Sequence, residues 1–136
     1  MTSVKTAIYN RLVADTTYLA LLGVPTTAPY KTFVNLAPKE PTFPEVVLTF
    51  GDTITDQEFD GDTLVSVGGF IATAWTLDHT YETILDRIVY LVHQKPFTTT
   101  GFRLIFAGRG EEIFNEEFDA YGKQARFDLH YRREII

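Results

Sequence analysis

The residues from Asp56 to Asp62 carry the pattern in this sequence that comes nearest to a known metal site. Oxygen-bearing side chains alternate along the segment and a glycine follows the third of them, in the residues Asp56, Glu58, Asp60, Gly61 and Asp62. This order matches the first half of a calcium-binding EF-hand loop, in which the glycine permits a sharp turn. The twelfth position of such a loop supplies a bidentate glutamate, but here it is Val67, and the flanking residues are strand-like. We therefore predict a solvated hairpin tip at Asp60–Gly61 in place of a calcium site.

A second candidate for metal binding consists of His79, Glu82 and Asp86. Glu82 and Asp86 are four residues apart, so they lie on the same face of a helix. A second histidine at helical spacing is missing, although histidine pairs are common among such ligand sets. Charged helix faces are usually solvated, so we interpret these residues as the polar face opposite the stripe of Ile84 and Ile88. We expect no metal ion and no cofactor.

The remaining polar residues do not form the pattern of a catalytic site. His93 and His130 have no partner in the sequence that would position either of them as a general base. Gly108–Gly110 lacks the longer glycine spacing and the following helix of a phosphate-binding loop, so we interpret it as a turn. Two-carboxylate catalysis requires an environment that separates the two pKa values, and the sequence suggests none around the pairs Glu111–Glu112 and Glu116–Glu117. We expect that the protein is not an enzyme.

The charge of the chain is concentrated in two places. Its 136 residues include 12 basic and 18 acidic side chains, which give a net charge of −6. Ten of the acidic residues lie in two stretches without any basic residue: Asp52, Asp56, Glu58, Asp60 and Asp62, and Glu111, Glu112, Glu116, Glu117 and Asp119. The rest of the chain has eight acidic and twelve basic residues, a net charge of +4. Proteins that wrap DNA or bind anionic membranes present clustered positive charge, so the net charge disfavours both classes.

Length and composition indicate one ordinary globular unit. A chain of 15.4 kDa has room for one domain, which we place at residues 1–136. The sequence has no cysteine, which excludes disulfides, thiolate zinc sites and cysteine nucleophiles. We find no apolar run of about 18 residues and no basic region followed by an apolar stretch at the amino terminus, so we expect neither a membrane anchor nor a signal peptide.

Apolar residues recur at helical spacing in two parts of the chain. Val4, Ala7, Ile8 and Leu12 predict a first helix, and a short helical piece from Asp15, as its cap, to Gly23 follows. The clearest helix begins at Asp78 or Thr80 and runs to Gln94, with Pro96 ending it. Its apolar stripe consists of Tyr81, Ile84, Leu85, Ile88, Leu91 and Val92.

The strands are predicted from β-branched and aromatic residues and from alternation. We expect strands at Tyr30–Val34, Glu45–Phe50, Val65–Trp75, Phe102–Ala107 and Gln124–Glu134. Gly68–Gly69 marks a bulge in the third of these, and residues 108–121 read as an acidic excursion without regular structure. The last strand alternates strictly between apolar and polar residues, which indicates one buried and one wet face. The pattern predicts an α+β fold: a two-layer sandwich with a mainly antiparallel sheet of four to five strands and two helices on one face.

The order of several short motifs resembles a family of phage proteins. The motifs are Phe43–Val47 continued by Leu48, Phe50, Gly51 and Asp52, the acids Glu58, Asp60 and Asp62, the strand end Ala72–Trp75, the helical pair Leu85 and Asp86, a loop after Gly108, and the closing Leu129–Tyr131. In this order they resemble the tail terminator proteins of long-tailed bacteriophages, the minor tail protein U type, also described as tail completion or tail-to-head joining proteins. The resemblance covers most of the chain from about Val34 onward, plus the first helix.

The resemblance implies a structural role in the virion, at the head-proximal end of the tail. Members of that family share the predicted order of helix, strands, helix, strands, and six copies form a ring on the last ring of the tail tube. The ring stops tube elongation and offers its other face to the head-completion or connector protein. The implied partners are further copies of this chain in a homo-hexamer, the major tail tube protein and that head protein. Such a protein is made in the cytoplasm of the host bacterium, has no cofactor and contacts no membrane.

Within such a ring the acidic stretches have two alternative roles. They line the central channel, where negative charge lets DNA pass without sequence-specific binding, or they form salt bridges to basic surfaces of neighbouring copies, such as the one with Arg126, Arg132 and Arg133. Arg109 is included with the acids as a candidate interface or channel residue. Three other functions stay open: a small monomeric ligand-binding or accessory domain, another head-to-tail connector component, and a metal-dependent hydrolase if His79, Glu82 and Asp86 converge on an ion.

Overall fold

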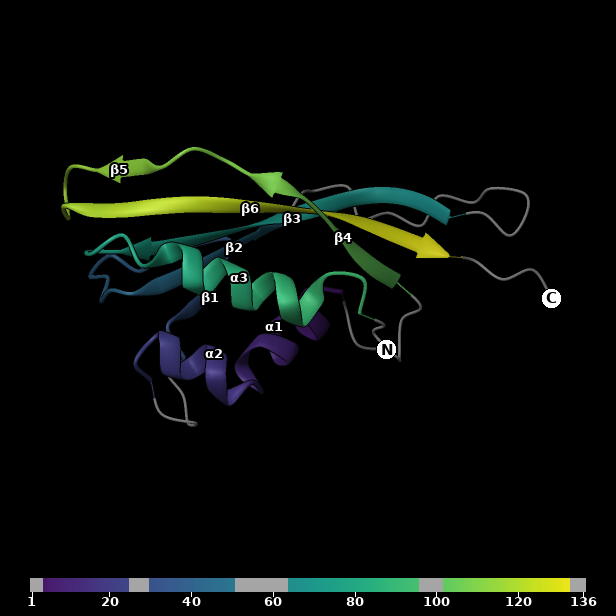
Figure 1. Cartoon of the computed structure of the whole chain (residues 1–136), viewed down its shortest axis with the longest axis horizontal. Coiled ribbons are helices and arrows are strands. Elements are labelled where there is room, and N and C mark those ends of the chain that lie inside the picture. The colour runs from purple at the N-terminus through teal and green to yellow at the C-terminus, as the bar shows by residue number, and fades with distance from the viewer. Residues whose placement is uncertain (1–3, 25–29, 51–63, 96–101, 133–136) are drawn as a thin grey trace.

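The helices cover one face of a single mixed sheet (Figure 1). The computed structural model describes residues 4–24, 30–50, 64–95 and 102–132. The helices are α1 (Val4–Val13), α2 (Thr16–Leu21) and α3 (Tyr81–Val92). The strands are β1 (Thr32–Val34), β2 (Glu45–Phe50), β3 (Leu64–Thr76), β4 (Phe102–Arg109), β5 (Ile113–Asn115) and β6 (Ala120–Arg132). The predicted two-layer α+β fold is confirmed, with one more strand and one more short helix than the fold-class prediction counted.

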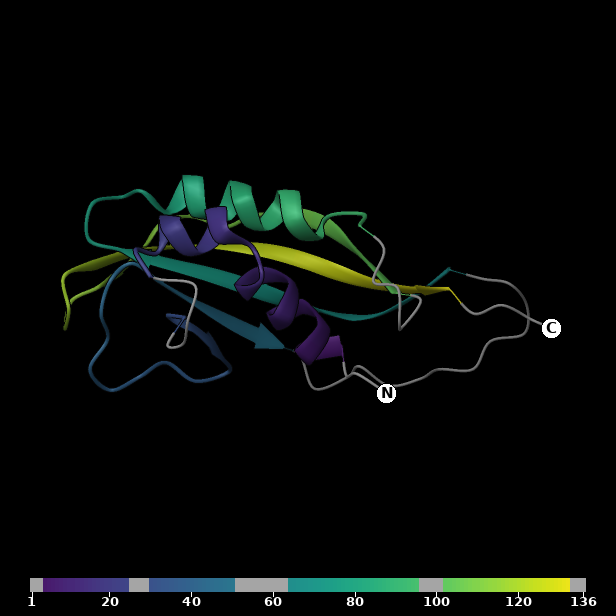
Figure 2. The ribbon, with the colours of Figure 1, turned by 90° about the horizontal axis from the view of Figure 1, so that it is seen from below.

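The sheet is antiparallel except at one edge. Its strand order is β1-β2-β3-β6-β4, and β5 pairs with β6 beside this path. Among the described strands, only β1 runs parallel to its neighbour. It lies at the edge of the sheet, where the prolines of the following segment remove no ladder hydrogen bonds. Figure 2 shows the same layers from the helical side, where α1 and α2 lie beside α3, in agreement with the contacts among these helices.

The first two helices begin and end as the sequence predicts. Asp15 takes an extended conformation as the N-cap of α2, and its carboxylate accepts a 2.8 Å hydrogen bond from the amide of Tyr18. This bond satisfies one of the free amides of the first helical turn. Gly23 follows α2 with a φ of 69°, the left-handed conformation in which glycine has no Cβ penalty. The chain therefore turns at Gly23, directly after α2.

The predicted bulge in β3 is present. The pairing of β3 with β6 shifts register between Ser66 and Gly69. A Cβ atom on Gly69 would lie 2.1 Å from the carbonyl oxygen of Phe127. The residue must therefore be glycine because the backbone of β6 approaches it too closely for any side chain.

Four phenylalanines form a row across the helix-facing side of the sheet. Phe50, Phe70, Phe127 and Phe106 come from β2, β3, β6 and β4, and each is registered opposite the next. Neighbouring ring centroids are 5.3, 4.8 and 5.7 Å apart in that order. The helices pack over this side with the fully buried residues Ile8, Leu12, Leu19, Ile84, Leu85 and Ile88. The core therefore lies between the helical layer and one face of the sheet.

The prediction for the carboxyl-terminal third was wrong in its boundaries. Residues 108–121 were expected to lack regular structure, but β4 continues to Arg109, β5 occupies Ile113–Asn115, and β6 begins at Ala120. The short β5 has exposed side chains and no alternation of burial, so its strand geometry follows from backbone pairing with β6 and not from a pattern of side chains. The alternation predicted for β6 itself is confirmed: Ala125 and Phe127 are buried, and Arg126 and Asp128 are exposed.

Candidate functional site

The second acidic stretch forms an arm at one end of the sheet. We call residues Glu111–Asp119 the acidic arm. The arm consists of Glu111 and Glu112, strand β5, and the turn that joins β5 to β6 (Figure 1). Its exposed acids are Glu111, Glu112, Glu116, Glu117 and Asp119. Two apolar side chains lie among them, Ile113 with 37% and Phe114 with 47% of its surface exposed. Such a mixture of apolar and acidic side chains is the composition of an interaction surface more than of a solvated turn.

Glu112 fixes the base of the acidic arm to the start of α3. Its Oε1 accepts a 2.6 Å hydrogen bond from the hydroxyl of Tyr81, and the Nδ1 of His79 lies 2.5 Å from the same oxygen. These bonds favour the charged carboxylate and lower the pKa of Glu112, while the bond to Glu112 raises the pKa of Tyr81 to about 12. The ring of His79 lies on Tyr121, with the centroids 3.8 Å apart. Glu112 is therefore held in place by two side chains of the same chain, Tyr81 and His79.

Arg109 joins β4 to the polar face of α3. Its guanidinium is hydrogen-bonded to the carboxylates of Glu82 and Asp86, and the ammonium of Lys123 lies 2.6 Å from the other oxygen of Glu82. Glu82 and Asp86 thus share one face of α3, as their spacing predicts. Their partners are cations of the sheet, so this face is not simply solvated as we interpreted it. The turn expected at Gly108–Gly110 is wrong for its first two residues, since β4 passes through them with a register shift beside Gly108.

His79, Glu82 and Asp86 do not converge on a common point. His79 contacts Glu112, whereas the two carboxylates contact Arg109 and Lys123. Across residues 4–24, 30–50, 64–95 and 102–132, no group of three or more potential ligands is close enough to hold a metal ion. This arrangement gives no support to the metal-dependent hydrolase alternative.

His93 has a packing role at the end of α3. Its Nδ1 accepts a 2.9 Å hydrogen bond from the backbone amide of Phe106 in β4, and the residue is half-buried. The helix ends at Val92, two residues earlier than predicted, because His93 turns to an extended conformation and bridges to Leu104. His93 is therefore a packed residue that joins the end of α3 to β4. His130 lies in β6 opposite Arg103 and Ser66.

The two acidic stretches are attached to opposite ends of the sheet. Asp52, Asp56, Glu58, Asp60, Asp62, the hairpin at Asp60–Gly61 and the calcium-like pattern lie outside the described residues. The strand that follows them begins at Leu64, which pairs with Arg132 near the end of β6. The acidic arm pairs instead with the start of β6, at Ala120–Gly122. One end of the protomer therefore carries the acidic arm, and the other end carries the attachment of the first stretch.

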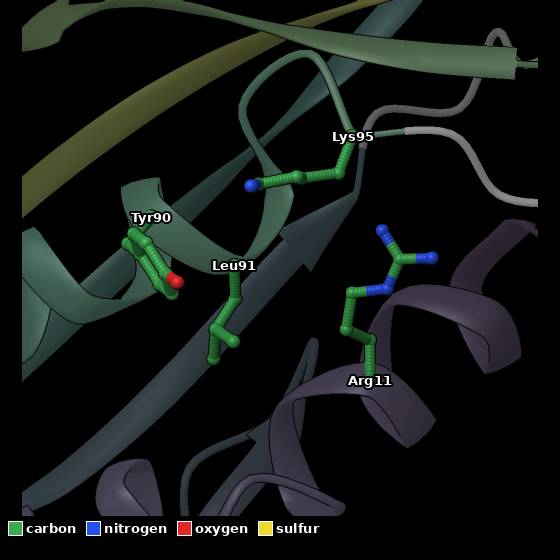
Figure 3. A pocket seen from close by; sticks show the side chains of 4 residues that line it. All are labelled: Arg11, Tyr90, Leu91 and Lys95. Carbon is green, nitrogen blue, oxygen red and sulfur yellow. The ribbon is translucent and has the colours of Figure 1, made fainter.

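A basic groove that the sequence did not predict lies between α1 and α3. It is lined by Arg11, Tyr90, Leu91 and Lys95 and has a volume of about 310 Å³ (Figure 3). Tyr90 is 59% exposed, and its ring lies 4.6 Å from the guanidinium of Arg87 and 5.0 Å from the ammonium of Lys95. Partial burial lowers the pKa of Arg11. We call these four lining residues the basic groove.

The wall of the groove is braced by an ion pair between α3 and α2. The guanidinium of Arg87 donates two 2.8 Å hydrogen bonds to the carboxylate of Asp15, which also caps α2. This bidentate bond lowers the pKa of Asp15. The groove escaped the sequence analysis because its cations come from segments far apart in the chain. An aromatic residue, Tyr90, on the otherwise polar side of α3 is the one signal in the sequence that could have indicated it.

Glu45 is a buried carboxylate at the start of β2. It is 3% exposed, and its Oε2 has no hydrogen-bond partner. Burial disfavours the charged form and raises the pKa of Glu45 to about 7, although the nearby Lys31 opposes part of this effect. The folded protein therefore binds this proton more tightly than the unfolded chain does.

This shift predicts a stability that falls as the pH rises. The proton on Glu45 contributes its full stabilisation of the fold below about pH 4.5, the pKa of this group in the unfolded chain. The stabilisation is lost as the pH increases through about 7, the pKa in the folded protein, and the free energy of unfolding falls by about 2–3 kcal/mol. Glu45→Gln is expected to remove this loss and to stabilise the protein at pH 8 by a similar amount. Urea unfolding of both proteins between pH 4.5 and pH 8 measures the effect. Glu40→Gln, at an exposed position, is the control, and equal pH profiles for wild type and Glu45→Gln would contradict the assignment.

The fold of the chain, but not its sequence, is similar to that of a known protein. No protein-family model and no curated protein sequence matches it. Its fold is similar to that of a solved chain from the virion of a native gene transfer agent particle, with a TM-score of 0.70 and 15% sequence identity. The similarity covers 96% of this chain and 96% of that chain. At this identity the likeness establishes a shared fold along nearly the full length of both chains.

Within the described residues, no helix combines the length and the apolar character needed to span a bilayer.

Proposed function

We propose that the protein is a structural component of a phage virion that forms a ring on the end of the tail tube. The ring, hexameric by the resemblance to tail terminator proteins, ends tube elongation and provides the surface that joins the tail to the head. The observation that carries this proposal is the fold shared with a virion chain over 96% of both chains. The order of motifs in the sequence supports the same role independently.

The surface of the described residues fits an assembly role better than a catalytic one. Charged side chains of α3, β4 and β6 are used in ion pairs that fasten the helix to the sheet, as in the contacts of Glu82 with Arg109 and Lys123. The acidic arm and the basic groove are two further surface features, and they have opposite charge. A ring requires two complementary surfaces on each protomer, and these features meet that requirement.

The proposed partners are further copies of this chain, the major tail tube protein and a head-completion or connector protein. DNA passes through the central channel of the ring without sequence-specific binding, because the chain has a net charge of −6 and does not attract phosphate. A different connector component of the head-to-tail junction is the second candidate, since it would also belong to a virion. A small monomeric ligand-binding domain stays as the alternative from another class.

Tail tubes growing in vitro provide the test. Purified protein is added during polymerisation of the tube protein from the same phage, and tube lengths are measured by electron microscopy. We expect tubes that stop growing and carry a ring at one end. Free elongation with bare ends would contradict the proposed capping role. Short tubes without rings would indicate that the protein acts on the tube protein in another way and would also contradict it.

A further inference from the structure

The acidic arm has the properties of one half of a protein interface. β5 pairs with β6 along one edge, and in the part of the chain that the structure describes no strand pairs with its other edge. Phe114 packs against Tyr121, with ring centroids 5.0 Å apart, but is still 47% exposed. Glu116 and Glu117 lie in the adjoining turn with exposed side chains. The arm therefore offers carboxylates beside an apolar surface.

The basic groove has the complementary composition. Arg11 and Lys95 supply positive charge, while Leu91 and the ring of Tyr90 supply apolar surface. Figure 3 shows Lys95 extending from the segment after α3 toward Tyr90, with Arg11 rising from α1. Tyrosine and arginine are enriched where proteins bind one another, and the positive charge of Arg11 and Lys95 complements an acidic segment that also carries an aromatic residue.

The arm and the groove of one chain do not meet. Glu112 holds the arm against Tyr81 at the start of α3, whereas Tyr90 and Lys95 lie at its other end. Along α3, Tyr81 and Tyr90 are separated by about 14 Å, from a rise of about 1.5 Å per residue. Since the two surfaces are complementary but lie at different ends, they are placed for a contact between different copies.

We infer that the acidic arm of one protomer docks in the basic groove of the next copy of this chain. Such a contact joins two different surfaces head to tail, and repeated contacts of this type close into a ring when the rotation permits. The inference rests on the proposed ring and names the surfaces that join its protomers. It assigns the second acidic stretch to the interface between protomers, with a basic partner other than the surface of Arg126, Arg132 and Arg133.

Disulfide cross-linking tests this contact directly because the chain has no cysteine of its own. One preparation carries Glu116→Cys in the arm and another carries Tyr90→Cys in the groove. They are mixed, with and without tail tubes, and oxidised under mild conditions. We expect a disulfide-linked dimer on a non-reducing gel, and a ladder of higher species from a chain with both cysteines. The control pair is Thr49→Cys with Tyr90→Cys, since Thr49 is exposed on the sheet face away from the helices and should give no dimer.

Charge reversal in the same cross-linking assay tests whether opposite charges hold the arm in the groove. Glu117→Lys in the arm preparation, or Lys95→Glu in the groove preparation, is expected to lower the yield of dimer about tenfold. The two reversals together should restore most of the yield, because they re-create an opposite-charge pair. If the double reversal yields as little dimer as either single reversal, the proposed pairing of these two charges is wrong. Glu117 and Lys95 are both exposed, so neither substitution should disturb the fold. If the second reversal restores the yield of dimer, misfolding does not explain the loss that the first reversal caused.

The gel and the tube lengths separate two kinds of failure. Absence of the arm-to-groove dimer both with and without tubes overturns this inference, even if tubes are capped by rings. Dimer formation without any effect on tube length supports the interface but contradicts the capping role. If Lys95→Glu abolishes capping while no arm-to-groove dimer forms, the groove binds the tube protein, which also overturns the inference.

Discussion

Gly69→Ala is expected to destabilise the protein by about 3 kcal/mol, because a new Cβ atom would lie 2.1 Å from the carbonyl oxygen of Phe127. The obstacle is a backbone atom of the neighbouring strand, so no side-chain rotation relieves the clash. The bulge in β3 must shift or its pairing with β6 must break, and β3 and β6 form the longest ladder in the sheet. Thermal unfolding should show a melting temperature lower by about 10 °C.

Gly110→Ala is the matched control for that substitution. A Cβ atom at Gly110 would lie 3.9 Å from the nearest atoms, which belong to Gln124, an ordinary contact distance. The expected change in unfolding free energy is within about 0.5 kcal/mol. Equal stabilities of the two variants would show that the approach of β6 to Gly69 does not constrain the fold.

Phe127→Ala is expected to have a comparable or larger effect, about 3–5 kcal/mol of destabilisation. The side chain is 1% exposed and stacks on Phe70 with an interplanar angle of 10°. Phe106 contacts it from the other side, so its removal leaves a cavity in the middle of the aromatic row. Chemical denaturation measures the loss as a lower midpoint with little change in slope.

Phe114→Ala removes the same atoms from an exposed position in the acidic arm. The side chain of Phe114 is 47% exposed in the folded protein, so its removal takes away few buried contacts. We therefore expect Phe114→Ala to destabilise the isolated protein by about 1 kcal/mol or less. A loss below about 1 kcal/mol for Phe127→Ala would contradict the central position assigned to the row. Phe114→Ala should instead weaken the arm-to-groove dimer.

Much of the fold could be predicted from local signals in the sequence. Asp15 is a good N-cap, Gly23 tolerates a positive φ, and Ile84, Leu85 and Ile88 repeat at helical spacing, so the helices were predictable from short segments. The alternation of Ala125 and Phe127 with Arg126 likewise identified β6 and its buried face. These features depend on residues a few positions apart, which a sequence displays directly.

The remaining features of the fold and of the candidate site depend on contacts between segments that are far apart in the sequence. β5 forms because β6 supplies its hydrogen-bonding partners, and its own side chains show no strand pattern. Arg109 looked like part of a glycine-rich turn, but its guanidinium binds carboxylates of α3. The basic groove combines Arg11 with Lys95, which only the packing of α1 beside α3 brings together. Neither spacing nor composition reports such pairings.

The candidate interface residues have been only partly located by the structure. Arg109, Glu111, Glu112, Glu116, Glu117 and Asp119 lie at or near one end of the sheet, and the acids of the first stretch are attached at the other. Glu112 and Arg109 already have partners within the protomer, which leaves the remaining acids of the arm for other contacts. We propose the end with the acidic arm for subunit contact, and lining of the DNA channel stays a prediction for the first stretch.

The position of the protein in the virion tests the central claim most directly. An antibody raised against the purified protein and coupled to gold is applied to purified virions, heads and tails, and the particles are imaged by electron microscopy. The proposed role predicts gold at the junction between head and tail in virions, and at one end of isolated tails. Gold along the whole tail, at the distal tip or on the head surface would contradict a ring that ends the tail tube.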